Sequence, residues 1–288
     1  MIPYKYIIAY LLFGALICAG CGPPTSVESA FKNLSIFQAD IWRTGNYDAR
    51  ASNEFQFVWK FAADGPVYSS PAAGGELILI GSEDSNLYAL NKNTGKLVWS
   101  YKTGGAVNSS PAVKNGVVFV GSHDHYLYAI NIEDGEEVWK FETNGPIQSS
   151  PAVDEESVYS GSDDGFLYAI DREGGDQVWV YDAGGAVRSS PVIANGVVYV
   201  GSDSHKLFAI DKVTGKGKWE HETGGPLTSS PYPYEGRILI GSHDNNLYIL
   251  NIKNRGSENQ FPTGAAIEST SGVHGERAFF GRNDGYLY

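Results

Sequence analysis

The sequence predicts an all-β fold built from repeated four-stranded units, because three features recur with a period of forty residues. The first feature is a tryptophan, found at Trp59, Trp99, Trp139, Trp179 and Trp219. The second is a Gly-Ser pair, whose glycines are Gly81, Gly121, Gly161, Gly201 and Gly241. The third is a Ser-Ser-Pro triplet, whose prolines are Pro71, Pro111, Pro151, Pro191 and Pro231. A period of this length, rich in Val, Tyr and Gly, is typical of stacked or radial repeat folds.

The segment from Ser109 to Trp139 shows what one period predicts locally. Residues 109–113 form a short extended run, and Asn115-Gly116 supplies the turn chemistry of a β-hairpin. Residues 116–122 are a continuous apolar run, as expected for a strand that is covered on both faces. Residues 126–130 form a third strand, and a turn leads from it into a fourth, which contains Trp139. Four antiparallel strands per forty residues correspond to one blade of a β-propeller.

The two ends of the array predict how the propeller closes. Glu54–Ala62 is a lone strand that carries Trp59, whereas the sixth block stops after three strands at Tyr288. A strand donated by the N-terminal side would complete that block and remove exposed sheet edges. We therefore expect six blades over residues 54–288, with the last blade shared between the two ends. The alternative is a truncated chain from a propeller of seven or eight blades.

The later repeats depart from the pattern. Ile249 replaces a small Ala, Arg255 replaces a turn Gly, and Asn259 replaces the Trp. In the next block, Ser271 replaces Pro and Arg282 replaces Ser. Terminal repeats of an array are commonly atypical. We expect the junction between the fifth and sixth blades to be the least tightly docked.

Two segments carry a family resemblance. Leu87–Gly95 followed by Trp99, and Leu207–Gly215 followed by Trp219, closely resemble the tryptophan-docking repeat of the pyrroloquinoline-quinone (PQQ) propellers. The resemblance covers roughly residues 38 to 288. It implies that the five register tryptophans are structural and pack on the neighbouring blade. Within the family, the chain is most similar in kind to the non-enzymatic BamB-type lipoproteins of outer-membrane assembly.

The N-terminus resembles a bacterial lipoprotein signal. Lys5 precedes an apolar run from Tyr6 to Ala19, which is too short for a comfortable membrane span and fits a secretory signal over residues 1–20. Cys18-Ala-Gly-Cys21 resembles a lipobox, so we expect lipidation at Cys21; an ordinary secretory signal cut nearby is the alternative. The residue directly after Cys21 is Gly22 and not Asp, which favours sorting of the lipoprotein to the outer membrane in a host that has two membranes. Residues 21–53 read as a tether and leader.

Several classes of function are disfavoured. Once the signal is removed, Cys21 is the one remaining cysteine, and lipidation would leave no thiol for disulfides, thiolate metal sites or nucleophilic catalysis. The net charge of −12 would repel phosphate backbones, so nucleic acid is an unfavourable partner. We expect no metal either, because His123-Asp-His125 lacks a third ligand placed by sequence. Catalytic motifs such as G-x-S-x-G are absent from the sequence.

A specific site requires positions that differ between otherwise equal blades. The position before each Ser-Ser-Pro, at the start of the innermost strand, is such a position: it holds Tyr68, Asn108, Gln148, Arg188, Thr228 and Glu268. We call this set the rim and predict that it binds a partner, with Arg188 as the best single candidate.

The hairpins beside the rim also vary. One hairpin position holds Glu83, His123, Asp163, Asp203, His243 and Asn283, and the position two residues later holds Ser85, His125, Gly165, His205, Asn245 and Gly285. Both sets should lie on the same face as the rim. Ordinary turn chemistry is the alternative explanation for these hairpins, and we favour it for Asp84, Asp124, Asp164, Asp244 and Asp284.

The resemblance implies a membrane-tethered periplasmic scaffold that has no cofactor and no enzymatic activity. Its partner would be an envelope protein, possibly of the outer-membrane assembly machinery, since BamB-type proteins dock on periplasmic domains of the assembly barrel. One alternative is a quinoprotein dehydrogenase that binds PQQ and calcium in the channel. Such enzymes are longer and usually carry an adjacent cysteine pair, which this chain lacks. A ligand-sensing propeller is the other alternative.

Overall fold

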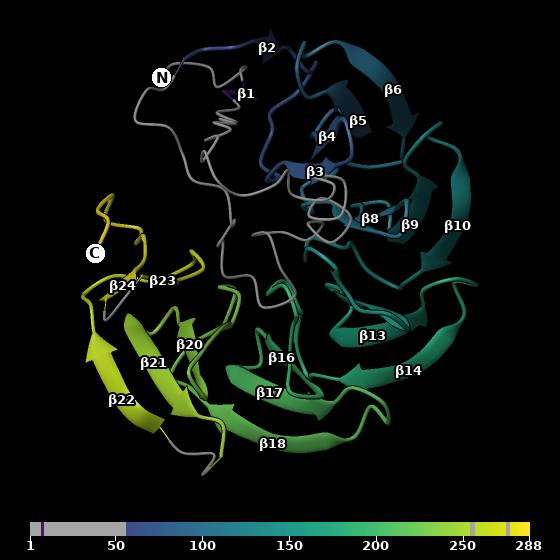
Figure 1. Cartoon of the computed structure of the whole chain (residues 1–288). Helices are drawn as coiled ribbons and strands as arrows, with labels where there is room; N and C mark the ends of the chain where they lie inside the picture. Colours follow the sequence, from purple (N-terminus) through teal and green to yellow (C-terminus); the bar gives the residue numbers. More distant parts are fainter. Residues whose placement is uncertain (1–6, 9–55, 254–256, 275–276) are drawn as a thin grey trace, which may run out of the picture.

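A computed structural model describes residues 7–8, 56–253, 257–274 and 277–288. It shows an all-β molecule with five four-stranded antiparallel sheets, arranged as the blades of a ring (Figure 1). The predicted fold class is thereby confirmed. No helix in the described ranges is long and apolar enough to cross a membrane. Cys21 and most of the predicted signal and leader lie outside the described residues.

Each blade follows the chain from its innermost to its outermost strand. Blade 1 contains β3 (Ala72–Gly74), β4 (Leu77–Gly81), β5 (Asn86–Asn91) and β6 (Leu97–Lys102). Blade 2 contains β7 (Ala112–Lys114), β8 (Val117–Gly121), β9 (Tyr126–Asn131) and β10 (Glu137–Glu142). Blade 3 contains β11 (Ala152–Val153), β12 (Ser157–Gly161), β13 (Phe166–Asp171) and β14 (Gln177–Asp182). Blade 4 contains β15 (Val192–Ala194), β16 (Val197–Gly201), β17 (Lys206–Asp211) and β18 (Gly217–Glu222). Blade 5 contains β19 (Tyr232–Tyr234), β20 (Arg237–Gly241), β21 (Asn246–Asn251) and β22 (Ser257–Pro262).

Turn chemistry fixes the first hairpin of each blade. Asn115 and Gly116 both adopt positive φ, +50° and +80°, which is the type I′ requirement that Asn-Gly meets at low cost. The predicted Asn-Gly hairpin is confirmed there. Blade 3 has no Asn-Gly pair at this turn, and the side chain of Asp154 stabilises the turn instead. The Asp154 carboxylate accepts the N–H groups of Glu156 and Ser157, both at 2.9 Å.

The core lies between blades. The second and third strands are buried on both faces, whereas the outermost strand alternates between exposed and buried residues. Trp139 of blade 2 belongs to one buried cluster with Ala129 of its own blade and Val158 and Tyr168 of blade 3. A single blade therefore cannot bury its faces, and neighbouring blades stabilise each other.

The register tryptophans dock on the next blade. The indole Nε1–H of Trp99 donates to the Ile132 carbonyl at 2.9 Å, and Trp139 does the same with Arg172 at 3.1 Å. Beneath the Trp99 ring lies Gly135, with φ +76°, where an added Cβ would come within 2.7 Å of the ring. The Trp and the turn Gly of the following repeat are thus required together, because the ring fits only over a residue without a side chain.

The Ser-Ser-Pro triplet is a framework element. The first serine clips the inner strand to its neighbour: the Ser149 hydroxyl donates to the Gly161 carbonyl at 2.8 Å and accepts the Gly161 N–H at 2.9 Å. The second serine links blades, since the Ser110 N–H donates to Ser150 Oγ at 2.9 Å. The same inter-blade bond recurs from Ser70 to Ser110, from Ser150 to Ser190 and from Ser190 to Ser230.

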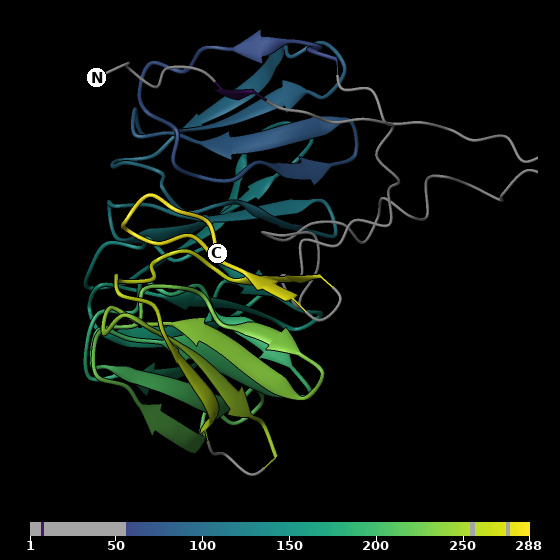
Figure 2. The ribbon, with the colours of Figure 1, turned by 90° about the vertical axis from the view of Figure 1, so that its left-hand side faces the viewer.

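The predicted closure of the ring is wrong in its strand pairing. The N-terminal strand β2 (Lys60–Phe61) pairs with β1 (Ile7–Ile8) and with no C-terminal strand among the described residues. The sixth blade consists of β23 (Gly272–His274), β24 (Arg277–Phe279) and a bridge from Gly281 to Leu287. Figures 1 and 2 show β2 and the C-terminal segment well apart. Trp59 nevertheless makes the regular docking bond to blade 1, since its Nε1–H donates to the Lys92 carbonyl at 2.8 Å, so docking on the next blade does not require the strand to pair with the C-terminal strands.

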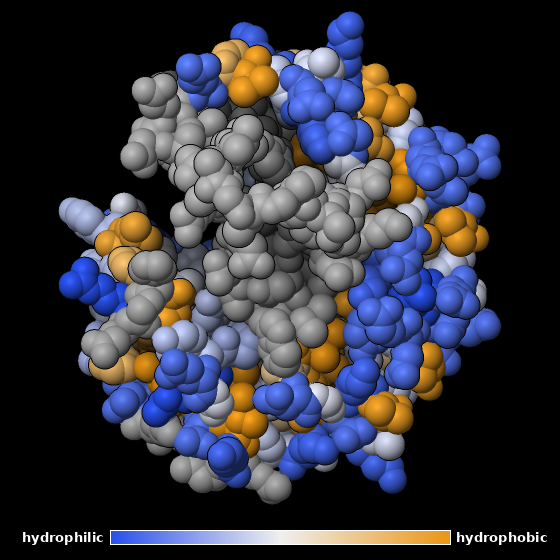
Figure 3. All heavy atoms as spheres, in the orientation of Figure 1, coloured by the Kyte–Doolittle hydropathy of each residue, from blue (hydrophilic) through white to orange (hydrophobic). Residues whose placement is uncertain are grey.

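Apolar residues on the outside of the ring are dispersed. Four valines are about half exposed: Val58, and Val98, Val138 and Val178 of the outermost strands β6, β10 and β14. Figure 3 shows hydrophobic residues scattered between hydrophilic ones around the periphery. Isolated apolar residues of this kind are ordinary on protein surfaces, so the search for a site turns to the channel end of the blades.

A candidate partner-binding rim

The serine clips place the rim beside the hairpins. Ser109 accepts the Gly121 N–H at 3.1 Å, which brings Asn108 next to the hairpin that follows Gly121. The same clip recurs in the later blades, so the rim residue of each of these blades lies beside the hairpin residue fifteen positions further on. The two variable sets that the sequence placed on one face are therefore in direct contact there.

Five such rim-to-hairpin contacts are formed. Asn108 Nδ2 lies 3.4 Å from His123 Nε2, and Gln148 Nε2–H donates to Asp163 at 2.7 Å. Arg188 Nη1–H donates to Asp203 at 3.0 Å, and Thr228 Oγ1 lies 2.8 Å from His243 Nε2. In the incomplete blade, Asn283 Nδ2–H donates to Glu268 at 2.7 Å. The rim is a set of polar pairs whose chemistry differs from blade to blade.

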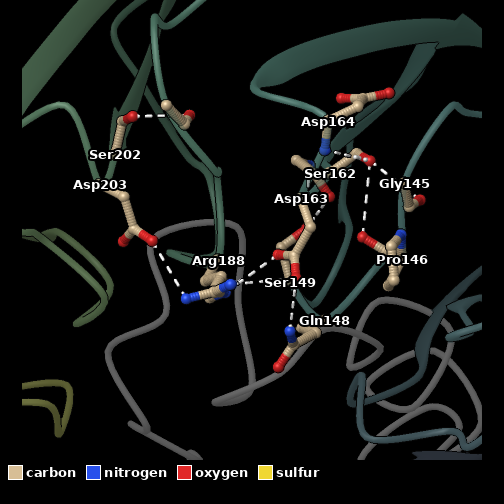
Figure 4. A network of polar contacts seen from close by, with 12 residues as sticks. Gly145, Pro146, Gln148, Ser149, Ser162, Asp163, Asp164, Arg188, Ser202 and Asp203 are labelled. Atoms are coloured by element: carbon tan, nitrogen blue, oxygen red, sulfur yellow. Dashed lines mark hydrogen bonds and ion pairs between the residues drawn. The ribbon is translucent and has the colours of Figure 1, made fainter.

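Arg188 is the centre of a bridge between blades 3 and 4. Figure 4 shows its guanidinium between Asp163 and Asp203, with Gln148 on the other side of Asp163. The bond from Nε–H to Asp163 is 3.0 Å long, equal to the bond to Asp203. The hydrogen bond to Asp163 is the main cause that raises the pKa of Arg188 above its usual value. Two carboxylates thus surround one cation, so this sector of the rim carries net negative charge.

A second bridge joins blade 5 to the sixth blade. His243 Nε2 lies 3.7 Å from Glu268 Oε1, in addition to its contact with Thr228. The side chains of His243 and Glu268 are 30% and 50% exposed, respectively. A partner can therefore reach both of them.

Tyr68 is the most exposed large side chain of the rim. It is 69% exposed, and Glu83, its hairpin counterpart on blade 1, is exposed as well. An exposed tyrosine offers a rigid apolar ring with one polar tip, a combination that is enriched at binding hot spots. Blade 1 consequently presents the apolar part of an otherwise polar rim.

The turn roles that the sequence favoured for the hairpin aspartates are confirmed. Asp124 accepts the Tyr126 N–H at 3.1 Å, and Asp164 accepts the Phe166 N–H at 3.0 Å. His125 and His205 adopt φ +78° and +65°, the left-handed geometry of a tight turn. Sequence reasoning missed the tyrosine four residues after each aspartate, although that spacing was visible in the repeat.

The two histidines of His123-Asp-His125 do not form part of a metal site in the described structure. Within the described ranges, no three His, Cys, Asp or Glu side chains are grouped closely enough to hold a metal ion. His123 contacts Asn108, and the backbone carbonyl of His125 accepts the Thr143 hydroxyl at 2.9 Å. The contacts that the structure shows at the rim are hydrogen bonds and ion pairs.

Known proteins support the same architecture. The family model described as beta-alanine-activating enzyme, beta-propeller matches residues 45–288. Among solved structures, BamB from Moraxella catarrhalis superposes with a TM-score of 0.56 at 19% identity, covering 81% of this chain and 87% of that chain. The computationally designed protein Ika8 superposes with a TM-score of 0.71 at 16% identity, covering 78% of this chain and 71% of that one. No curated protein matches the sequence.

Proposed function

This chain belongs to the family described as beta-alanine-activating enzyme, beta-propeller, and we propose that it is a non-enzymatic propeller scaffold that binds a protein partner with its rim. The observation that carries the proposal is the contrast between framework and rim. The docking tryptophans, glycines and serines hardly change between blades, whereas the six rim residues are all different. Positions that vary on a constant framework are free to be shaped by a partner.

The rim fits a protein partner in its chemistry. Tyr68 supplies an exposed aromatic anchor, and the bridges at Arg188 and His243 hold charged groups in fixed positions. Protein interfaces commonly combine a few aromatic or charged anchors with a hydrated polar surround. The carboxylates that surround Arg188 suit basic or amide-rich segments better than acidic ones.

Location and partner follow from the resemblance to BamB-type lipoproteins. We propose that the chain is anchored through lipid on Cys21 to the outer membrane and faces the periplasm. Replacing Cys21 with Ser should release the protein from membranes or leave it unprocessed. A Cys21→Ser variant that is processed at the same place and still sediments fully with membranes would refute the anchor.

The proposed partner class supplies a direct test. Binding of the full chain to the purified periplasmic domains of the host's outer-membrane assembly barrel can be measured by calorimetry. The double variant Tyr68→Ala/Glu268→Ala should raise the Kd at least about tenfold, because it removes the aromatic anchor and an exposed rim charge. Glu133→Ala is the control, since Glu133 is exposed in the turn between β9 and β10, at the opposite end of the blade. No binding by the unaltered chain, or equal loss in the control, would overturn the proposal.

The second candidate is an enzyme, because the description of the family names one. The resemblance to PQQ propellers defines the assay: oxidation of alcohols and sugars by the purified chain with PQQ and calcium. We expect no turnover. Measurable turnover that depends on PQQ would replace the scaffold with the dehydrogenase.

A further inference from the structure

A cavity of about 570 Å³ lies between blade 5 and the incomplete sixth blade. Leu247, Ile249 and Phe261 of blade 5 form one wall. Ala278, Phe280 and Tyr288 of the sixth blade form the other. Its size falls within the ~300–1,000 Å³ that is usual for small-molecule sites, and its lining is mainly apolar and aromatic. The junction that we expected to be the least tightly docked thus contains this cavity.

The equivalent space in a complete junction is filled. Between blades 2 and 3, the Trp139 ring shares one buried cluster with Ala129 and Tyr168. Phe141 also packs edge-on against Tyr168, with ring centroids 5.4 Å apart. Blade 5 lacks the indole because Asn259 occupies the Trp position.

The aromatic packing of this junction differs as well. Tyr288, the counterpart of Tyr168, stacks on Phe280 of its own blade at 6.0 Å. The cavity therefore occupies the region where the other junctions hold an aromatic ring, and its walls are suited to a planar one.

Arg282 adds a charge to this apolar site. It lines the cavity at the position where the preceding blades have serine, and its side chain is only 7% exposed. In blade 2 the equivalent Ser122 hydroxyl donates to the Gly105 carbonyl at 3.1 Å. Serine at this position therefore stabilises the framework through a hydrogen bond to the backbone, and Arg282 replaces that serine.

The guanidinium of Arg282 retains donor capacity. It lies 3.6 Å from the centre of the Tyr288 ring, and its hydrogen bonds to Asp284 and to the Tyr288 hydroxyl both use Nη2. The buried Nε–H has no hydrogen-bond partner in the described part of the chain. A buried donor without a partner is costly, so an anionic acceptor at this point would be favourable.

We propose that the cavity binds a small aromatic carboxylate. The planar ring would lie between the Phe261 and Phe280 walls, and the carboxylate would accept hydrogen bonds from Arg282 on the side away from Asp284. The assignment to a carboxylate follows from the planar, multi-donor geometry of the guanidinium. The assignment to an aromatic ring follows from the shape and lining of the space.

Calorimetry on the full chain tests this proposal with indole-3-carboxylate and indole as probes. The unaltered chain should bind indole-3-carboxylate saturably and more tightly than indole. Arg282→Ser restores the residue of the other blades. It should raise the Kd for indole-3-carboxylate at least tenfold and leave the Kd for indole unchanged. Ala278→Phe should abolish binding of both probes by filling the cavity from the sixth blade, and Ile249→Phe should do so from blade 5. Circular dichroism and melting curves establish that each variant is folded, and either filling variant suffices if the other does not fold.

The controls separate this site from the rim. Tyr68→Ala changes a residue of blade 1 that does not line the cavity, so it should leave both affinities unchanged. Absence of saturable binding by the unaltered chain, equal affinity for the two probes, or binding that persists in a folded filling variant would overturn the proposal. None of these results bears on the rim, whose partner is measured separately.

Discussion

The Tyr128 hydroxyl donates to the Asp124 carboxylate at 2.7 Å, and this pair recurs through the propeller. Equivalent bonds join Tyr88 to Asp84, Tyr168 to Asp164, Tyr248 to Asp244 and Tyr288 to Asp284, at 2.6 to 2.9 Å. Burial, together with the neighbouring carboxylate, raises the pKa of Tyr88 and of Tyr248 to about 12. Each carboxylate thus binds a protonated hydroxyl over the whole physiological range.

Blade 4 lacks both members of the pair. Ser204 and Phe208 occupy the two positions, and the Ser204 hydroxyl is buried without a hydrogen-bond partner in the described structure. Elsewhere the aspartate also accepts an N–H from the preceding loop, as Asp164 does from Asn144 at 2.9 Å. In blade 4 the Gly184 N–H donates to the Asp182 carboxylate instead, at 2.8 Å. The joint replacement indicates that aspartate and tyrosine act as one unit.

Restoring that unit should therefore be cooperative. We expect Ser204→Asp/Phe208→Tyr to be more stable than the sum of the single changes by at least about 0.5 kcal/mol, the coupling usual for residues in contact. In blade 2, Tyr128→Phe should lower the free energy of unfolding by about 1–2 kcal/mol, because it removes a hydroxyl from a partly buried acceptor. Urea unfolding of the four proteins of the cycle measures the coupling. A coupling energy near zero would show that the two positions vary independently.

The contact between Trp139 and Gly175 can be separated from backbone strain. Gly175 has φ +77°, and an added Cβ would meet the Trp139 ring at 2.8 Å. Gly196 has nearly the same φ, +76°, but has nothing within 4 Å of the added atom. Both alanine substitutions carry the left-handed penalty of about 1–2 kcal/mol, so Gly175→Ala should cost clearly more than Gly196→Ala. Trp139→Ala should cost about 3–5 kcal/mol. Equal denaturant midpoints for the two alanine variants would contradict the docking role.

Local repetition explains which features the sequence could predict. The blades and the shared face of rim and hairpins follow from a forty-residue register that acts within one repeat and its neighbour. The Arg188 bridge depends on how closely Asp163 of the preceding blade approaches, which is a matter of the angle between blades. Ring closure depends on the same angle summed over the whole array. No single residue encodes that sum, so pairing between Glu54–Ala62 and the C-terminal strands could not be inferred reliably.

Arg188 should contribute to stability as well as to the rim. Arg188→Ala leaves Asp163 and Asp203 facing each other without the cation that bridges them. Because Arg188 is 42% exposed, we expect a loss of only about 1 kcal/mol in the free energy of unfolding. The loss should shrink in ~1 M NaCl, where surface charges are screened. Asp163→Asn in the Arg188→Ala background should recover part of the loss, since it removes one of the two facing charges. A loss that is insensitive to both salt and Asp163→Asn would assign the effect to packing.

The blade 4–5 junction should be sensitive to pH through His221. Its ring packs edge-on against Tyr248, with centroids 5.7 Å apart, at a position where the earlier blades have Phe61, Tyr101, Phe141 and Tyr181. Burial lowers the pKa of His221 below its usual 6.5, so the folded state prefers the neutral ring.

The sign of the pH effect follows from linkage. Below about pH 6.5 the unfolded chain binds a proton at this residue more readily than the folded chain does, so stability falls as the pH falls and levels off below the folded pKa. Urea unfolding between about pH 5 and about pH 8 should show this loss, and His221→Phe should reduce it. The other five histidines of the chain are present in both proteins, so the difference between the two pH profiles reports on His221. Parallel pH profiles for the two proteins would show that His221 does not titrate on unfolding.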